Sequence, residues 1–282
     1  MKKVVIVFIL ILVLIALLVL GLKICKNWGN KAQVLDYEYT VVSRYDTSCA
    51  DSTDCTSFYV SYPVFSKKRT SNAAIDRLND EVYDLVDSDG MTLEVVADGF
   101  FDDYEKYLEQ RRKIALEEND STMLSYVSAW YFSAECAVVV NAPTMVVVRM
   151  DYSRYEGGAH GMYGSLYGNY DVASGKGYSL YDVFTDTVAL AQRITEKFIE
   201  RYQVDDQVPL WDQGYFVDDE DVLPIAENFA LLPQGVLFYY NVYEIAAYAA
   251  GPQYVIMSYE ELKDIMRFIP DFEKAEVFSS DL

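Results

Sequence analysis

Residues 155–184 constrain the fold more than any other part of the chain. They hold the protein's single histidine, His160, and seven of its 14 glycines. Gly157 and Gly158 precede the histidine, and Gly161 follows it. Glycine reaches positive φ without steric cost and allows other backbone to approach closely. The sequence therefore predicts that His160 lies in a tight turn whose shape is set by the backbone.

An apolar run near the amino terminus predicts a membrane segment. Residues 4–22 contain no polar side chain and follow Met1-Lys2-Lys3. As a helix they would span roughly 28 Å, which is close to the thickness of the bilayer's hydrocarbon core. The run is longer than a typical signal-peptide core, and Val19-Leu20-Gly21 is a poor cleavage site. We expect residues 1–28 to form an uncleaved single-pass anchor, with a cleaved signal peptide as the alternative.

The charge of the rest of the chain excludes some classes of partner. The formal net charge is −21, and removing the four lysines of residues 1–27 leaves −25. Such a surface repels nucleic acid and attracts cationic proteins at low salt. The simpler alternative is that the charge only keeps the domain soluble. Flanking lysines do not decide the orientation of the anchor, so the remaining features favour a cell-membrane protein with an extracytoplasmic carboxy-terminal part.

The cysteines do not indicate a metal site. Cys49 and Cys55 flank a polar loop and could close a small disulfide ring in an oxidising compartment, whereas Cys136 lies in an apolar strand and is expected to be a buried thiol. A zinc site needs paired Cys/His spacings, which one histidine and scattered cysteines do not provide. We therefore predict no metal and no cofactor.

Hydrophobic periodicity predicts an α+β fold in which antiparallel sheets pack against helices. Period-two segments alternate along the chain with segments of helical period. Two further short strands are expected within residues 155–184, and a capping box at Ser258 and Glu261 opens a final helix that continues to Arg267. The expected strands are 34–43, 57–65, 124–140, 144–153, 229–231, 236–240 and 254–257, and the expected helices contain residues 75–85, 101–108 and 187–202. Strands and helices in this order indicate α+β rather than a repeated βαβ unit.

Five motifs occur in a familiar order. They are Tyr62-Pro63-x-Phe65, Gly157-Gly158-Ala159-His160-Gly161, Gly175-Lys176-x-x-Ser179-Leu180-x-Asp182-x-Phe184, Phe229-x-Leu231-x-x-x-Gly235-Val236-x-Phe238 and Tyr243-Glu244-Ile245-Ala246-x-Tyr248-x-x-Gly251. Together they resemble the paired extracytoplasmic domains of unknown function in the anti-sigma factor RsiV. A related domain precedes the catalytic module of the peptidoglycan deacetylase PdaC. The resemblance implies two related subdomains after the anchor, at residues 29–172 (PdaC/RsiV-like) and 173–282 (RsiV-like).

The resemblance also implies a function class. In RsiV-like proteins this exported unit binds lysozyme. Here only Met1-Lys2-Lys3 precedes the apolar run, and no deacetylase module follows Leu282, so neither anti-sigma nor deacetylase activity is expected. The expectation is an exported domain that recognises a cell-envelope ligand, either a cationic protein such as lysozyme or a peptidoglycan fragment.

Candidate ligand-binding residues come from the glycine-rich stretch and the last motif. A tyrosine ring covers an apolar face while its hydroxyl forms hydrogen bonds, although tyrosines in strands more often pack within sheets. Glu244 lies in a largely apolar run, so we interpret it as a buried acid bonded to backbone, His160 or Arg154. The predicted ligand-binding set is His160, Tyr163, Tyr167, Glu244 and Tyr248.

The alternative function is a cell-wall hydrolase that uses His160 with a carboxylate such as Glu244. Ser165 and Asp171 lie near the histidine in sequence, but the chain has no G-x-S-x-G elbow, and a catalytic triad is identified by geometry. The simpler interpretation is structural: His160 forms hydrogen bonds within its own turn. The sequence favours a binding protein over an enzyme without deciding between them.

Overall fold

The structure is a computed structural model that describes residues 34–46, 55–66, 72–86, 90–120, 122, 128–218 and 221–278. The predicted anchor and Cys49, and with it the proposed disulfide ring, lie outside these residues. Among the helices of the described residues, none is both long enough and apolar enough to cross a membrane. The chain divides into two units, Met1–Val34 and Leu35–Leu282, and the second unit contains all the described helices and strands.

The first sheet has the strand order β1-β2-β3-β4-β5, with a short strand β9 added beside β3. Its strands are β1 (Asp36–Tyr45), β2 (Ser57–Ser66), β3 (Tyr131–Asn141), β4 (Met145–Tyr155), β5 (Met162–Asp171) and β9 (Glu276–Val277). The predicted β3–β4 hairpin is confirmed. The prediction of purely antiparallel sheets is wrong at one place, because β2 and β3 pair in parallel. Two helices connect these strands, and a long helical crossover is what parallel neighbours require.

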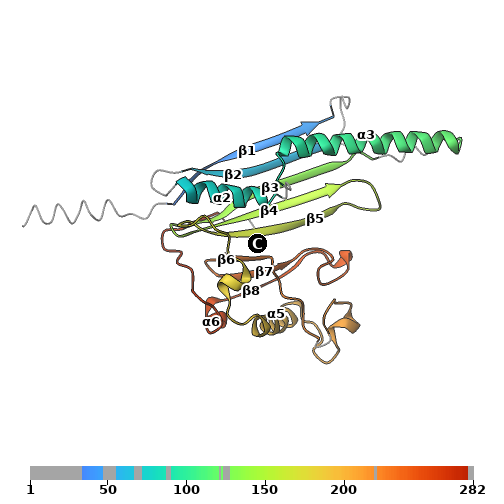
Figure 1. The fold of residues 1–282 in the computed structure, drawn as a ribbon. Coiled ribbons are helices and arrows are strands. Elements are labelled where there is room, and N and C mark those ends of the chain that lie inside the picture. The colour runs from blue at the N-terminus through green and yellow to red at the C-terminus, as the bar shows by residue number, and fades with distance from the viewer. Residues whose placement is uncertain are drawn as a thin grey trace, which may run out of the picture. The chain divides into compact units, whose positions relative to one another are not determined.

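The two connecting helices lie against one face of this sheet (Figure 1). They are α2 (Asn72–Asp84) and α3 (Leu93–Glu117). The second is longer than the predicted repeat over residues 101–108, because it already begins after an N-cap at Thr92, whose side chain accepts a hydrogen bond from Val95 N.

Alternate residues of β4 belong to two different hydrophobic cores. Val146, Val148 and Met150 pack with the apolar stripes of α2 and α3. Met145 and Val147 pack with the carboxy-terminal half of the chain. Because successive side chains of a strand point to opposite faces, the first sheet is covered on both sides.

The carboxy-terminal half forms a second, three-stranded sheet of order β6-β7-β8. Its strands are β6 (Phe229–Leu232), β7 (Gly235–Tyr240) and β8 (Gln253–Met257), and its helical segments are α4 (Leu180–Val183), α5 (Thr187–Tyr202), α6 (Tyr259–Leu262) and the 3₁₀ turns η2 (Leu210–Gln213) and η3 (Tyr248–Ala250). The boundaries of α5 agree with the sequence prediction. The described part of the molecule is therefore α+β with mainly antiparallel sheets.

Two local predictions for this half are wrong. After the capping box at Ser258, α6 ends at Leu262 instead of Arg267. The residues beyond it bond to the α4 region: Thr185 N donates to Ile265 O, and Arg267 N donates to Val183 O. The second short strand expected in residues 155–184 is reduced to one bridge between Tyr170 and Gly177. After α6, tertiary hydrogen bonds replace the helical ones that were expected from the sequence.

Asparagine side chains close the edges where the two sheets meet. Asn241 Oδ1 accepts from Ser165 N at 2.8 Å, and Asn228 Oδ1 accepts from Tyr167 N at 2.9 Å, so both amides bind the outer edge of β5. In return, Asn169 Oδ1 accepts from Leu231 N at 2.7 Å and its Nδ2 donates to Phe229 O at 2.8 Å on β6. Open strand edges invite pairing with other chains, and these amides satisfy them within the molecule.

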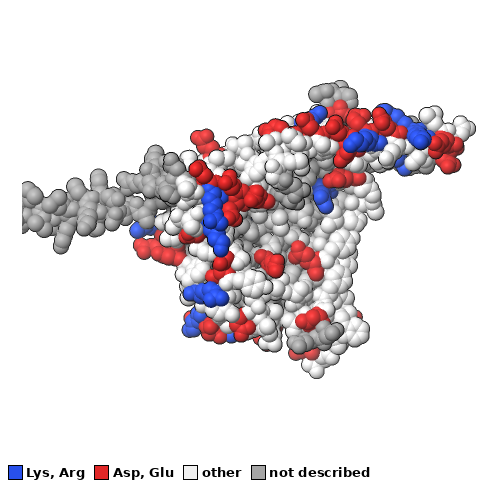
Figure 2. All heavy atoms as spheres, in the orientation of Figure 1, with Lys and Arg blue, Asp and Glu red and all other residues white. Residues whose placement is uncertain are grey.

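The acidic composition is visible on the surface. Acidic side chains lie along α3 and elsewhere on the face shown in Figure 2, with fewer basic side chains among them.

Arg193 of α5 forms a bidentate ion pair with Asp264, with nitrogen–oxygen distances of 2.8 and 2.7 Å. Arg193 also donates a hydrogen bond to Glu261 O at 2.7 Å. This contact joins α5 to the segment after α6.

Replacing Asn169 tests the edge closure. Asn169→Ala would leave Phe229 O and Leu231 N buried without a partner, and we expect the free energy of unfolding to fall by about 2 to 4 kcal/mol. Urea denaturation measures this free energy of unfolding. Gln207→Ala, which removes an amide from the exposed loop after α5, serves as the control and should cost less than about 0.5 kcal/mol. Equal effects would contradict the assignment.

The Arg193–Asp264 pair predicts a pH effect. Hydrogen bonds from Arg193 lower the pKa of Asp264 from 3.8 to about 2. A folded-state pKa below the unfolded value means that the pair stabilises the fold above about pH 4 and that this contribution is lost as the pH falls towards 2. Asp264→Asn should therefore reduce stability at neutral pH and lose its effect in acid. The effect is small because the pair is largely exposed. A pH-independent difference in thermal midpoint would contradict this.

Candidate functional site

The predicted glycine turn is confirmed. It connects β4 to β5, and Gly157 and Gly158 have φ values of +93° and +99°, which L side chains rarely adopt. The hydroxyl of Tyr155, the last residue of β4, donates to Gly158 O at 3.0 Å. The turn presents His160 at its tip, where the ring is exposed.

His160 belongs to an exposed aromatic group. Its ring stacks on Tyr248 with 4.0 Å between the ring centroids, and Tyr163 meets Tyr248 edge-on at 5.8 Å. Tyr243 lies 5.5 Å from Tyr248, and its hydroxyl is 3.3 Å from His160 Nε2. We call these four residues the histidine–tyrosine cluster. It joins the β4–β5 turn to the loop after β7.

The contacts of the imidazole define its tautomer. His160 Nδ1 is 2.9 Å from Gly161 O, and because a carbonyl only accepts, Nδ1 carries the proton. In the neutral ring Nε2 then accepts from the Tyr243 hydroxyl. Tyr248 donates its hydroxyl to the same Gly161 carbonyl at 3.0 Å. Among the described residues, the hydrogen-bond partners of His160 are thus a carbonyl and a phenol.

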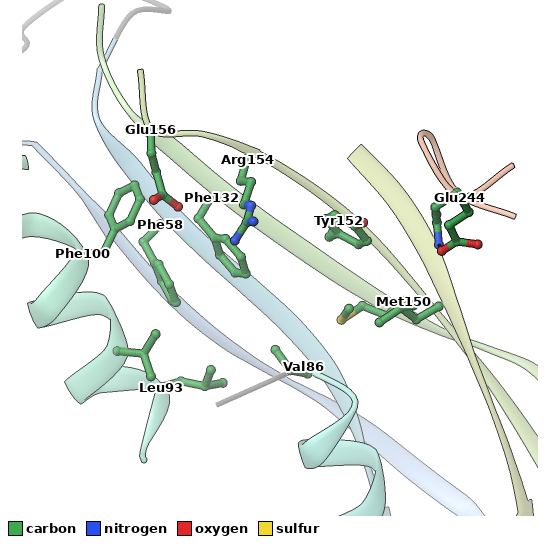
Figure 3. A pocket seen from close by; sticks show the side chains of 13 residues that line it. Phe58, Val86, Leu93, Phe100, Phe132, Met150, Tyr152, Arg154, Glu156 and Glu244 are labelled. Atoms are coloured by element: carbon green, nitrogen blue, oxygen red, sulfur yellow. Dashed lines mark hydrogen bonds between the residues drawn. The ribbon is translucent and has the colours of Figure 1, made fainter. Parts of the chain in front are cut away.

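A pocket of about 430 Å³ opens beside the cluster on the helix-covered face of the first sheet. One end is polar, with Arg154 of β4 and Glu156 just after β4 directed towards Phe58 and Phe132, as Figure 3 shows. Glu244 approaches from the loop after β7. We call this the helix-side pocket; its apolar lining comprises Phe58, Val86, Leu93, Val96, Phe100, Phe132, Met150 and Leu166.

The prediction of a buried Glu244 is wrong. The side chain is exposed, and its Oε1 accepts from Asn241 Nδ2 at 3.2 Å rather than from His160. The apolar run containing it is not one continuous strand: β7 ends at Tyr240, and the chain then turns, with φ of +69° at Tyr243. Tyr243 and Glu244 consequently face solvent, while Ile245 is buried.

The fold does not assemble a Ser–His–acid triad from the neighbours of His160. Ser165 and Asp171 lie six residues apart on β5, a separation of roughly 20 Å along a strand. The Ser165 hydroxyl donates to Asp151 at 2.6 Å, and Asp171 accepts from the Ser174 hydroxyl.

The remaining predicted residue, Tyr167, lies elsewhere. It packs against Tyr239 of the second sheet, with 5.7 Å between centroids. The structure thus brings together His160, Tyr163 and Tyr248, places Glu244 in the adjoining pocket and separates Tyr167. Sequence reasoning missed Tyr243, although it stands in the same motif as Tyr248 and directly precedes Glu244.

The described residues show no metal centre. They contain no group of three or more His, Cys, Asp or Glu side chains that could hold an ion. Cys136 is buried in β3 as predicted, and burial raises the pKa of its thiol to about 12. A thiol in that state is inert at neutral pH.

Comparisons with known proteins agree with the motif order. Residues 49–163 match the family model described as Deacetylase PdaC, and residues 181–260 match one described as a protein of unknown function, DUF3298. The described residues thus form an α+β fold in which two family models match consecutive parts of the chain. These two matches, in this order, are to the paired domains that the five motifs resemble.

Solved structures share the fold. A DUF3298 family member from Bacteroides fragilis is 24% identical with a TM-score of 0.67, covering 84% of this chain and 95% of its own. A DUF3298 family protein from Pseudomonas aeruginosa is 17% identical with a TM-score of 0.58, covering 84% and 96%. No curated protein matches the chain. At these identities the likeness concerns the fold alone.

The exposure of His160 predicts that its removal leaves the fold intact. Since the ring contacts only exposed or half-buried groups, His160→Ala should change the free energy of unfolding by less than about 1 kcal/mol. Chemical denaturation followed by circular dichroism measures this change. A loss comparable to that of Asn169→Ala would show that the imidazole holds the two halves of the chain together.

Proposed function

We propose that the protein is a recognition module on the outer side of the cell membrane, anchored through residues 4–22, which binds a cell-envelope ligand. The ligand is a cationic protein such as lysozyme or a peptidoglycan fragment. The observation that supports this most is the histidine–tyrosine cluster, an exposed aromatic surface beside a pocket with two carboxylates at its rim.

The chemistry of the cluster suits contact better than catalysis. Tyr163 is 40% and Tyr243 48% exposed, and each packs against Tyr248, so the cluster presents aromatic area to solvent. Tyrosine contributes apolar area and a hydroxyl at little entropic cost, so it is favoured in protein interfaces. His160 is fixed by a carbonyl, a phenol and a ring rather than oriented by a carboxylate.

The charge distribution supports a cationic partner. Glu156 and Glu244 line the helix-side pocket with a single guanidinium, Arg154, and acidic side chains continue over the face in Figure 2. Surface charge of one sign raises the rate at which an oppositely charged protein associates. The aromatic cluster would then supply the salt-resistant part of the binding.

Replacing Tyr248 tests the proposal. Tyr248 touches the other three members of the cluster, so Tyr248→Ala should weaken binding of lysozyme or of soluble muropeptides by about tenfold. Isothermal titration calorimetry of the full chain in detergent micelles, at low and high salt, measures the affinity. Tyr181→Ala is the matched control, because Tyr181 is an exposed tyrosine on α4 and should leave binding unchanged.

Other outcomes contradict the proposal. Binding that disappears at high salt would indicate only nonspecific attraction to an acidic surface. Binding to neither ligand would exclude both ligand classes. The mass of the recovered ligand is measured in the same samples. A change in ligand mass that no longer occurs with His160→Ala would favour the alternative function, a cell-wall hydrolase.

A further inference from the structure

A second cavity lies between the two sheets, on the face of β4 and β5 opposite the helix-side pocket. Its volume is about 410 Å³, within the range of pockets that hold small ligands. We call it the inter-sheet cavity. Its lining comprises Arg149, Asp151, Ser165, Tyr167, Leu237, Tyr239, Pro252 and Tyr254.

The wall formed by the first sheet is polar but carries no net charge. Arg149 Nε lies 3.0 Å from Asp151 Oδ2, and the Ser165 hydroxyl donates to Asp151 Oδ1 at 2.6 Å. The Arg149–Asp151 approach is close enough for an ion pair, but its angle does not make a hydrogen bond, so the buried Nε–H donor is unsatisfied. Buried donors normally have partners, so this pair is incomplete.

The opposite wall is aromatic. Tyr239 of β7 and Tyr254 of β8 are paired neighbours whose rings are nearly parallel, at an angle of 11° and a centroid distance of 6.4 Å. Tyr167 of β5 closes the corner, 5.7 Å from Tyr239. Arg201 of α5 lies 4.0 Å from the centroid of Tyr254 and holds this ring in place. Burial raises the pKa of Tyr167 to about 12, so its hydroxyl stays neutral.

We propose that the inter-sheet cavity binds a neutral saccharide. A pyranose ring has apolar C–H faces that lie on tyrosine rings and hydroxyl groups that both donate and accept hydrogen bonds. Asp151 offers acceptors and Arg149 offers donors side by side, which matches adjacent sugar hydroxyls.

The charge balance distinguishes this ligand class from others. An anionic ligand would be repelled by Asp151, and a cationic one by Arg149, unless the pair separated. A purely apolar ligand would displace water from the Arg149–Asp151–Ser165 group without replacing its hydrogen bonds, which is costly. An uncharged molecule with both apolar faces and hydroxyls fits all the walls.

This site is separate from the histidine–tyrosine cluster. Tyr163 belongs to the cluster, whereas Ser165 and Tyr167, further along β5, line the inter-sheet cavity. Saccharide binding at this cavity can therefore succeed or fail whatever the outcome for lysozyme.

The test is a panel of trisaccharides: tri-N-acetylchitotriose, cellotriose, maltotriose and trigalacturonic acid. Saturation-transfer NMR and titration calorimetry are performed on the full chain in detergent micelles. We expect at least one neutral trisaccharide to bind and trigalacturonic acid not to bind. Tyr239→Ala and Asp151→Asn should each weaken that binding by about tenfold or more, the latter without loss of fold because Asp151 is 48% exposed.

Tyr181→Ala is the matched control, since it removes an exposed tyrosine on α4 that does not line the inter-sheet cavity and should leave saccharide affinity unchanged. Three results would overturn the proposal: no neutral trisaccharide binds at millimolar concentration, only trigalacturonic acid binds, or binding survives both cavity variants. If Tyr248→Ala abolished saccharide binding and Asp151→Asn did not, saccharide recognition would belong to the histidine–tyrosine cluster instead.

Discussion

The closure of two strand edges by asparagine side chains is the constraint on which the arrangement of this protein depends. β5 and β6 are edge strands of different sheets, and each would expose unpaired backbone groups. Asn228 and Asn241 bind the edge of β5, and Asn169 binds the edge of β6. An amide presents a donor and an acceptor with the geometry of a peptide group, so each one stands in for a neighbouring strand. Gly164 makes this possible, because an added Cβ there would overlap Asn241 Oδ1.

These asparagine hydrogen bonds set the positions of the histidine–tyrosine cluster and of the inter-sheet cavity, the two surfaces to which we assign binding. Asn241 directly follows β7 and binds the edge of β5, so the next residues, Tyr243 and Glu244, emerge beside the β4–β5 turn. Tyr248 then reaches Gly161 O and the ring of His160. Further along the same face of β5, the same contact between sheets brings Tyr239 opposite Arg149 and Asp151. The histidine–tyrosine cluster and the inter-sheet cavity thus follow from one set of hydrogen bonds.

Much of the local structure was predictable because local physics specifies it. The α5 helix has an apolar stripe and an Asp186 cap, β2 and β7 have β-branched and aromatic residues, and the glycines at 157 and 158 take positive φ. Three of the five predicted site residues do meet: His160 in the β4–β5 turn, Tyr163 at the start of β5 and Tyr248 in the loop after β7. The prediction for Glu244 failed since an apolar neighbourhood in sequence was interpreted as burial, whereas the chain turns there.

By itself the sequence determined the α+β class, most strand and helix boundaries, the order of the two family resemblances and the histidine turn. These depend on periodicity, capping and glycine conformation, which act over a few residues. The tertiary structure alone decided the parallel pairing of β2 with β3, the early end of α6, the exposure of Glu244 and the meeting of Arg149, Asp151 and Tyr239. Such features arise from hydrogen bonds and packing between residues far apart in the chain, and no local pattern encodes which distant partner a backbone or side-chain group will find.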